Sequence, residues 1–262
     1  LLRCLEYAAT HDFLVIFNPQ DTSLVANGVM HEGATSSDMG LVGIPESAET
    51  VEVARALILI EQSGVRAHFG QLSCERSIKL IGIARANGFQ VSADVAMHHL
   101  FFTDENTRGF NSMFHVQPPL RSQLDRAGLI HALVIDGLQA ICSDHQPHEA
   151  AAKQAPFAAT EAGMSTLETL LPMGLQLVEQ GLIDLSQLIE KLTCAPAKIL
   201  GINAGSLEVG ATADVTIFDP QAQWLVDENS LVSAGKNSVF IGSELKGKVM
   251  HTLVAGEVVF SH

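Results

Sequence analysis

The chain has 262 residues, of which 47% are hydrophobic and 17% charged. This length suits one α/β barrel or two smaller domains, and the composition is that of a globular protein without bias towards disorder. The formal net charge of −14 argues against non-specific binding to nucleic acid or to an acidic membrane. No apolar run reaches the ~20 residues of a bilayer span, and the cysteines form no CxxC pair, so we expect a cytoplasmic protein without disulfides.

The first part of the chain alternates strands with helices. Residues 1–9 resemble the interior of an amphipathic helix with no start signal before it, so we expect this chain to be the C-terminal part of a longer protein. Short apolar runs predict strands, and longer periodic segments predict helices. The predicted strands are 13–17, 65–69, 90–95 and 138–142, and the predicted helices are 47–63, 73–87, 122–135, 165–180 and 185–200. Four such βα units make half of an eight-stranded barrel, and no glycine-rich phosphate loop favours an open doubly wound sheet.

From residue 214 the pattern changes to β. Residues 215–218 end in the turn Asp219-Pro220, and 248–253 and 257–260 flank Ala255-Gly256 as a hairpin. The predicted fold class is therefore α/β: the second half of a TIM-type (β/α)8 barrel in residues 1–202, followed by the C-terminal part of a small β-sandwich domain in residues 203–262. Half a barrel has two open edges and one uncovered face, so we expect these residues alone to be poorly stable or to associate.

The segment Ser143-Asp144-His145-Gln146-Pro147-His148 directly follows the fourth predicted strand. An Asp at the mouth of such a strand, with two histidines close behind, is where a barrel hydrolase would keep a metal-bound base. By residue type alone, an Asp that anchors a loop or caps a helix is the favoured interpretation.

Four segments carry a resemblance to one family. Residues 43–49 (GIPESAE) resemble GIPxxAE, 98–105 (HHLFFTDE) resemble HHLxLTDE, 117–121 (QPPLR) resemble NPPLR, and 143–148 (SDHQPH) resemble TDHAPH. In these segments and over nearly all its length, the chain resembles the C-terminal portion of dihydroorotases, members of the amidohydrolase superfamily. The resemblance implies a metal-dependent barrel enzyme, with zinc as cofactor, that closes carbamoyl-aspartate into dihydroorotate or opens it.

The resemblance also assigns site positions. In active members the metals sit on an HxH pair and a carboxylated Lys, which would precede residue 1, and on two later histidines and one Asp. The two histidine positions correspond to Asn18 and Gln71, and the Asp to Asp144, as metal ligand and catalytic base. Since a carboxamide oxygen is a weak zinc ligand, these substitutions predict zinc binding that is weak or absent. His68 is no simple replacement, because positions 68 and 71 of an alternating strand face opposite sides unless a bulge intervenes.

Substrate contacts would fall at four positions: Gln117 (an Asn in the family), His148, Ala162 and Gly163. His98 and His99 are expected to be buried and bonded to neighbouring loops, and Arg121 to close its loop through a salt bridge. Six further histidines are expected to be solvated or capping residues: His11, His31, His115, His131, His251 and His262.

Three functions remain open. The favoured one is a dihydroorotase-like protein of de novo pyrimidine biosynthesis that has lost catalysis and acts, in an oligomer, as a structural partner of aspartate transcarbamoylase. The second is an active dihydroorotase or related cyclic amidohydrolase that hydrolyses dihydroorotate to carbamoyl-aspartate with unusual ligands. The third is a binder that senses a pyrimidine precursor. Neither nucleic acid nor a membrane is an expected partner.

Overall fold

A parallel, four-stranded sheet organises the first part of the chain. In the computed structural model, which describes residues 1–262, its strand order is β1-β4-β5-β6, and every neighbouring pair is parallel. The strand bounds are Val15–Phe17 (β1), Ala67–Phe69 (β4), Val91–Ala96 (β5) and Ala140–Cys142 (β6). All four strands predicted for this part are confirmed at or near their expected positions.

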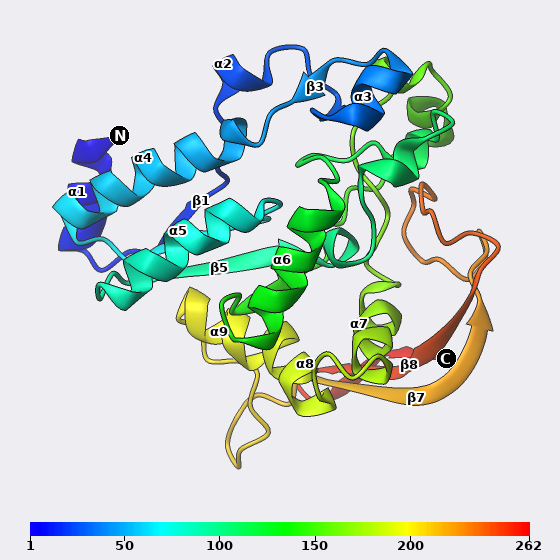
Figure 1. Cartoon of the computed structure of the whole chain (residues 1–262). Coiled ribbons are helices and arrows are strands. Elements are labelled where there is room, and N and C mark those ends of the chain that lie inside the picture. Colours follow the sequence, from blue (N-terminus) through cyan, green and yellow to red (C-terminus); the bar gives the residue numbers. More distant parts are fainter.

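Helices cover one face of this sheet (Figure 1). Their bounds are Leu2–Thr10 (α1), Ser47–Ser63 (α4), Glu75–Ala86 (α5) and Gln123–Val134 (α6). Alternate strand residues, among them Phe69, Val91 and Val95, join these helices in one cluster of 28 buried hydrophobic residues. Ile16 points to the opposite face of β1 and is 58% exposed. The second face is therefore open at the β1 edge, whereas His68 of β4, in register with Ile16, is buried.

The long connection after β1 contains short elements that the sequence pattern did not reveal. They are α2 (Thr22–Val25), β2 (Met30–His31), α3 (Ala34–Met39) and β3 (Gly43–Ile44), with β2 and β3 paired in parallel. A strand of two residues is too short to produce a period, which explains the omission. Five 3-10 helices lie in the later connections: Met97–Leu100 (η1), Asp104–Thr107 (η2), Ser112–Phe114 (η3), Ala150–Lys153 (η4) and Phe157–Ala159 (η5).

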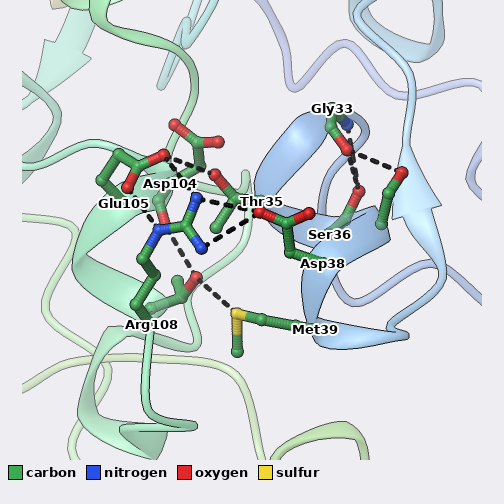
Figure 2. Close-up of polar contacts among 10 residues, drawn as sticks. Gly33, Thr35, Ser36, Asp38, Met39, Asp104, Glu105 and Arg108 are labelled. Carbon is green, nitrogen blue, oxygen red and sulfur yellow. Dashed lines mark hydrogen bonds and ion pairs between the residues drawn. The ribbon is translucent and has the colours of Figure 1, made fainter.

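A polar cluster joins the connection after β1 to the one after β5, as Figure 2 shows. Thr35 of α3 donates a hydrogen bond to Glu105 of η2 at 2.8 Å. Arg108 contacts the Glu105 carboxylate at 2.5 Å and that of Asp38 at 3.3 Å. These contacts hold together two segments that are about 70 residues apart in the chain.

The predicted helix 185–200 is two helices. Their bounds are Leu185–Leu192 (α8) and Cys194–Leu200 (α9), and the preceding helix is Leu170–Glu179 (α7), shorter than the predicted 165–180. The break falls at Thr193, whose φ and ψ are −132° and −80°. Pro196 has no N–H for the Leu192 carbonyl and its ring would clash with it, so a continuous helix cannot pass this point.

The last part of the chain is an antiparallel sheet. Its strands are Val215–Leu225 (β7), Glu244–Val254 (β8) and Glu257–Ser261 (β9), in that order. The predicted hairpin at Ala255-Gly256 is confirmed, with the positive φ values of 50° and 86° that a tight hairpin turn requires. Strand β7 does not end at Pro220 as predicted. A register shift between Asp219 and Gln223 accommodates this proline, which has no N–H for the ladder.

The antiparallel sheet packs against α7 (Figure 1). A Cβ atom at Gly247 of β8 would lie 2.3 Å from Cδ1 of Leu175 of α7, and the positive φ of 100° at Gly247 also favours glycine. No helix of the structure combines the length and apolar character that a membrane crossing requires.

Candidate functional site

Three residues predicted to correspond to family metal ligands lie at the carboxyl ends of the parallel strands. Asn18 directly follows β1, Gln71 follows β4, and Asp144 follows β6. Gln71 and Asp144 both adopt positive φ values, 57° and 47°, which turn the chain sharply after each strand. Because parallel strands end at the same edge of a sheet, the three side chains converge.

The side chains of Asn18, Gln71 and Asp144 are linked in this order by hydrogen bonds. The Asn18 Nδ2 atom donates to Gln71 Oε1 at 3.1 Å, and Gln71 Nε2 donates to Asp144 Oδ1 at 2.6 Å. Gln146 Nε2 donates to the same Asp144 oxygen at 2.8 Å. Each carboxamide therefore uses its N–H groups to reach an oxygen of its neighbour.

Asp144 is buried, and its second oxygen is less occupied than its first. The Nε2 atom of His98 lies 3.8 Å from Asp144 Oδ2, and neither ring nitrogen of His98 has a hydrogen-bond partner. Burial raises the pKa of the Asp144 carboxyl above its usual value; the hydrogen bond from Gln146 lowers it, and the charge of Asp94 raises it further. His98 is buried as predicted but, unlike the prediction, is not hydrogen-bonded to a loop.

This donor set does not fit a zinc ion. Zinc in proteins takes imidazole nitrogens, thiolates and carboxylates, whereas two of the three groups here are carboxamides. Moreover, Gln71 presents an amide nitrogen to Asp144, and an amide N–H group cannot act as a metal ligand. No group of three or more His, Cys, Asp or Glu residues lies close enough together to hold a metal ion.

His68 does not take the place of Gln71. Its Nδ1 atom lies 2.8 Å from Ser92 Oγ and its Nε2 atom 2.9 Å from Asp94 Oδ2, so both ring nitrogens are engaged. The other Asp94 oxygen accepts the Gln71 backbone N–H at 2.7 Å. Asp94 thus links His68 to the site, a role that the sequence analysis missed; an acidic residue inside a short apolar strand was the available signal.

His148 and the segment of Ala162 and Gly163, all predicted to bind substrate, lie together next to Gln146 and its hydrogen bond to Asp144. His148 Nε2 lies 2.9 Å from the carbonyl oxygen of Ala162. A Cβ atom on Gly163 would lie 2.6 Å from Gln146 and 2.9 Å from His148. Asn237 fixes this arrangement, because it accepts from the His148 N–H at 2.7 Å and donates to the carbonyls of Gln146 and Gly163 at 3.0 and 3.1 Å.

Gln117 lies on another side of the site. It lines a cavity of about 30 Å³ together with Asn18 and Arg121, which has room for about one water molecule. The structure therefore brings Gln117 near Asn18, while His148, Ala162 and Gly163 gather around Gln146.

Arg121 is buried and closes its loop, although not through a direct ion pair. Its Nε atom donates to Ser73 Oγ at 3.0 Å, and Ser73 in turn bonds to the buried carboxylate of Glu49. Its Nη1 atom donates to the Ile44 carbonyl at 2.8 Å and lies 3.3 Å from His31 Nδ1. The expected salt bridge is thus replaced by a hydroxyl-bridged contact.

His115 is not solvated, although it does cap the C-terminal end of η3, one of the two roles expected for it. The ring is buried, and its Nδ1 atom lies 2.8 Å from Thr160 Oγ1. Burial, and to a smaller extent the positive charge of Lys153, lowers the pKa of His115 to about 4. Lys153 donates to the carbonyls of His115 and Glu161 at 3.2 and 2.6 Å. The Gly163 N–H donates to the His115 carbonyl at 2.8 Å, so this cluster supports the segment predicted to contact substrate.

Known proteins resemble this chain in sequence. A dihydroorotase-like protein of Pseudomonas aeruginosa is 54% identical over 98% of this chain and 61% of the relative. A dihydroorotase-like protein of Pseudomonas putida is 52% identical and a dihydroorotase of Geobacter sp. 41% identical, with the same coverage. The chain thus spans 61% of the length of these curated relatives.

Solved structures resemble it in fold. L-Hydantoinase (dihydropyrimidinase) from Arthrobacter aurescens superimposes with a TM-score of 0.88 at 25% identity, over 99% of this chain and 60% of that one. A D-hydantoinase gives a TM-score of 0.83 at 25% identity, over 100% and 60%. These likenesses confirm the predicted fold class, part of a TIM-type barrel beside an antiparallel sheet. The profile of the amidohydrolase family matches residues 30–259, and the chain belongs to that family.

Proposed function

We propose that this chain is part of a dihydroorotase-like protein of pyrimidine biosynthesis in which hydrolysis has been lost, and which serves as a structural partner of aspartate transcarbamoylase. The observation that carries the proposal is the hydrogen-bonded chain from Asn18 through Gln71 to Asp144. A metal-dependent hydrolase needs charged or imidazole ligands at this edge of the sheet in order to activate water. Carboxamides that satisfy each other there offer neither metal affinity nor a base.

The loops around the site support the same conclusion. In the family, the segment at Ala162 and Gly163 contacts substrate through its backbone, together with the residue at His148. Here Ala162 O is bonded to His148, and Gly163 uses its N–H for His115 and its carbonyl for Asn237. A substrate would have to displace these internal bonds, each contributing about 1 kcal/mol, before it could bind.

The partner is proposed from resemblance. Residues 18–21, 143–145 and 235–237 are similar to the non-catalytic branch of the family that assembles with aspartate transcarbamoylase. The relatives at 54% and 52% identity are called dihydroorotase-like protein, whereas the one at 41% is called dihydroorotase. Residues 235–237 pack closely on the loop that follows residues 143–145, since a Cβ on Gly235 would lie 2.4 Å from the His148 nitrogen.

A second candidate is an active cyclic amidohydrolase, and one observation favours it. Asp144 is retained, its pKa is raised by burial, and its Oδ2 atom accepts no hydrogen bond from the chain. A buried carboxylate with one free oxygen can accept a proton from water or from a substrate nitrogen, as general base catalysis requires.

Zinc content and turnover of the intact protein, purified without chelator, separate the two candidates. The proposal predicts negligible zinc, no hydrolysis of dihydroorotate above background, and co-purification of aspartate transcarbamoylase with a tagged copy. Stoichiometric metal together with turnover at an enzyme-like rate would overturn it in favour of the second candidate. Absence of zinc together with absence of the transcarbamoylase would remove the partner and leave only the loss of catalysis.

A further inference from the structure

A second cavity lies between α7 and the antiparallel sheet, in the region where Figure 1 draws α7 beside β8. Its volume is about 350 Å³, and none of the residues of the hydrogen-bonded site lines it. Small-molecule sites commonly occupy about 300–1,000 Å³ and combine apolar walls with a few polar groups. The cavity therefore has the size of a ligand site that is separate from the proposed function.

The walls of the cavity are mainly apolar and aromatic. Leu171 and Pro172 at the start of α7 form one side, and Val249 of β8 lies among the sheet residues. Trp224 of β7 and Phe260 of β9 add two aromatic rings. Faces of this kind favour a planar ligand, because aromatic rings gain from offset stacking beyond their burial.

Trp224 is held in place before any ligand arrives. Its Nε1 atom donates a hydrogen bond to the Gly247 carbonyl at 2.9 Å. Gly247 itself lies against the Leu175 side chain of α7. Since the indole N–H already bonds to the backbone, the ring can offer its face to a ligand. The ring is also ordered before binding, so binding costs little side-chain entropy at Trp224.

Lys248 supplies a positive charge at this aromatic wall. Its Nζ atom lies 5.9 Å from the centroid of the Trp224 ring and 2.7 Å from Nε2 of His262. No carboxylate forms an ion pair with Lys248, whereas the neighbouring Lys246 is paired with Glu179. Lys248 therefore places a positive charge without a carboxylate partner beside the Trp224 ring.

The one acidic residue in the lining forms no ion pair with Lys248. The Glu168 carboxylate accepts hydrogen bonds from the Ser233 backbone N–H at 2.6 Å and from its hydroxyl at 2.8 Å. Hydrogen bonds from Ser233 help to hold the pKa of Glu168 below its usual value, against the effect of its burial. The Glu168 oxygens are thus bonded to Ser233, and Lys248 has no carboxylate partner in the cavity.

We propose that this cavity binds a small planar aromatic carboxylate, with its ring against Trp224 and Phe260 and its carboxylate at Lys248. The side-chain amide of Asn229, which also lines the cavity, offers a further hydrogen-bond donor. The inference concerns binding only and is independent of the proposed function.

Trp224 is the single tryptophan of these 262 residues, and its emission in the intact protein would report on the cavity. We would titrate the protein with nicotinate and benzoate, and with their neutral amides nicotinamide and benzamide, and follow tryptophan emission. The same titrations on Trp224→Phe give the background to subtract. The expected result is a saturable change with the acids and binding of the amides that is about fivefold weaker, because only the acids form a charge-assisted contact with Lys248.

The matched variants Lys248→Met and Lys246→Met test whether the ligand carboxylate contacts Lys248. Lys248→Met should weaken binding of the acids about fivefold and leave the amides unchanged, whereas Lys246→Met, on the same strand but outside the cavity, should change neither. Circular dichroism checks that both variants keep the fold. The proposal is overturned by a non-saturating response to both acids, by equal affinity for acid and amide, or by acid binding that survives Lys248→Met unchanged.

Discussion

Acidification should destabilise the protein through His99, and the size of the effect follows from its surroundings. The ring is buried, and its Nε2 atom lies 3.1 Å from the Pro118 carbonyl, beside Gln117. Because a carbonyl oxygen only accepts, Nε2 carries the proton of the neutral ring, and the buried Nδ1 atom has no partner. Burial lowers the pKa of His99 from 6.5 to about 4, since a second proton would place a charge in the protein interior.

The sign of the effect follows from proton uptake by the two states. Above pH 6.5 the ring is neutral in both the folded and the unfolded chain, and His99 adds no pH dependence. Between pH 6.5 and about 4 the unfolded chain takes up a proton that the folded chain refuses, so the free energy of unfolding falls. A difference of about 2.5 pKa units, at about 1.4 kcal/mol each, would give about 3.5 kcal/mol in full; at pH 4 the folded-state ring is itself half protonated, so the loss is about 3 kcal/mol.

The variant His99→Gln isolates this contribution, because a glutamine side chain can donate to Pro118 but does not titrate in this range. Urea unfolding of the intact protein and the variant at pH 7 and pH 4 gives the difference in unfolding free energy at each pH. That difference should shift by about 3 kcal/mol in favour of the variant at pH 4. The exposed His131 of α6 provides the control, and His131→Gln should show little shift. An equal difference at both pH values for His99→Gln would refute the reasoning.

Three further predictions concern packing, metal and the open sheet. Gly128→Ala should destabilise the protein by about 1–3 kcal/mol, because the new Cβ would lie 2.1 Å from Glu75 Cγ across the α5–α6 contact. Gly82→Ala in α5, with nothing within 4 Å, should stabilise it by up to about 1 kcal/mol, and thermal unfolding that gave both variants the same sign would contradict this assignment. Asn18→His combined with Gln71→His should raise the zinc content measured by mass spectrometry, since two imidazoles would then face Asp144; unchanged content would argue against the family correspondence. The 262 residues alone should associate or melt without cooperativity because β1 and β6 are sheet edges, and a cooperative monomeric melt in calorimetry with light scattering would count against it.

The sequence allowed the parallel sheet to be predicted because each of its strands is a short apolar run between turn signals. The connection after β1 was not predictable in this way, since β2 and β3 contain two residues each and alternate too briefly to form a pattern. The break between α8 and α9 was foreseeable from Pro196, whose effect on the preceding turn was overlooked.

The candidate site was predicted only in part. The strand-end positions of Asn18, Gln71 and Asp144 made their convergence predictable once the strands were known to be parallel. The direction of each carboxamide was not, because it depends on which neighbour accepts its N–H groups. Asn237 was equally hidden, since its partners lie 74–91 residues earlier in the chain and no local pattern records such contacts.

The contacts of Asn237 also bear on how the protein is made. Residues 143–163 leave the ribosome well before Asn237 does, yet it is Asn237 that bonds to both ends of this stretch. During synthesis, the loops around Asp144 therefore lack the hydrogen bonds of Asn237 until residue 237 has been made. A nascent chain that stops short of residue 237 would leave these loops unsecured and open to proteases.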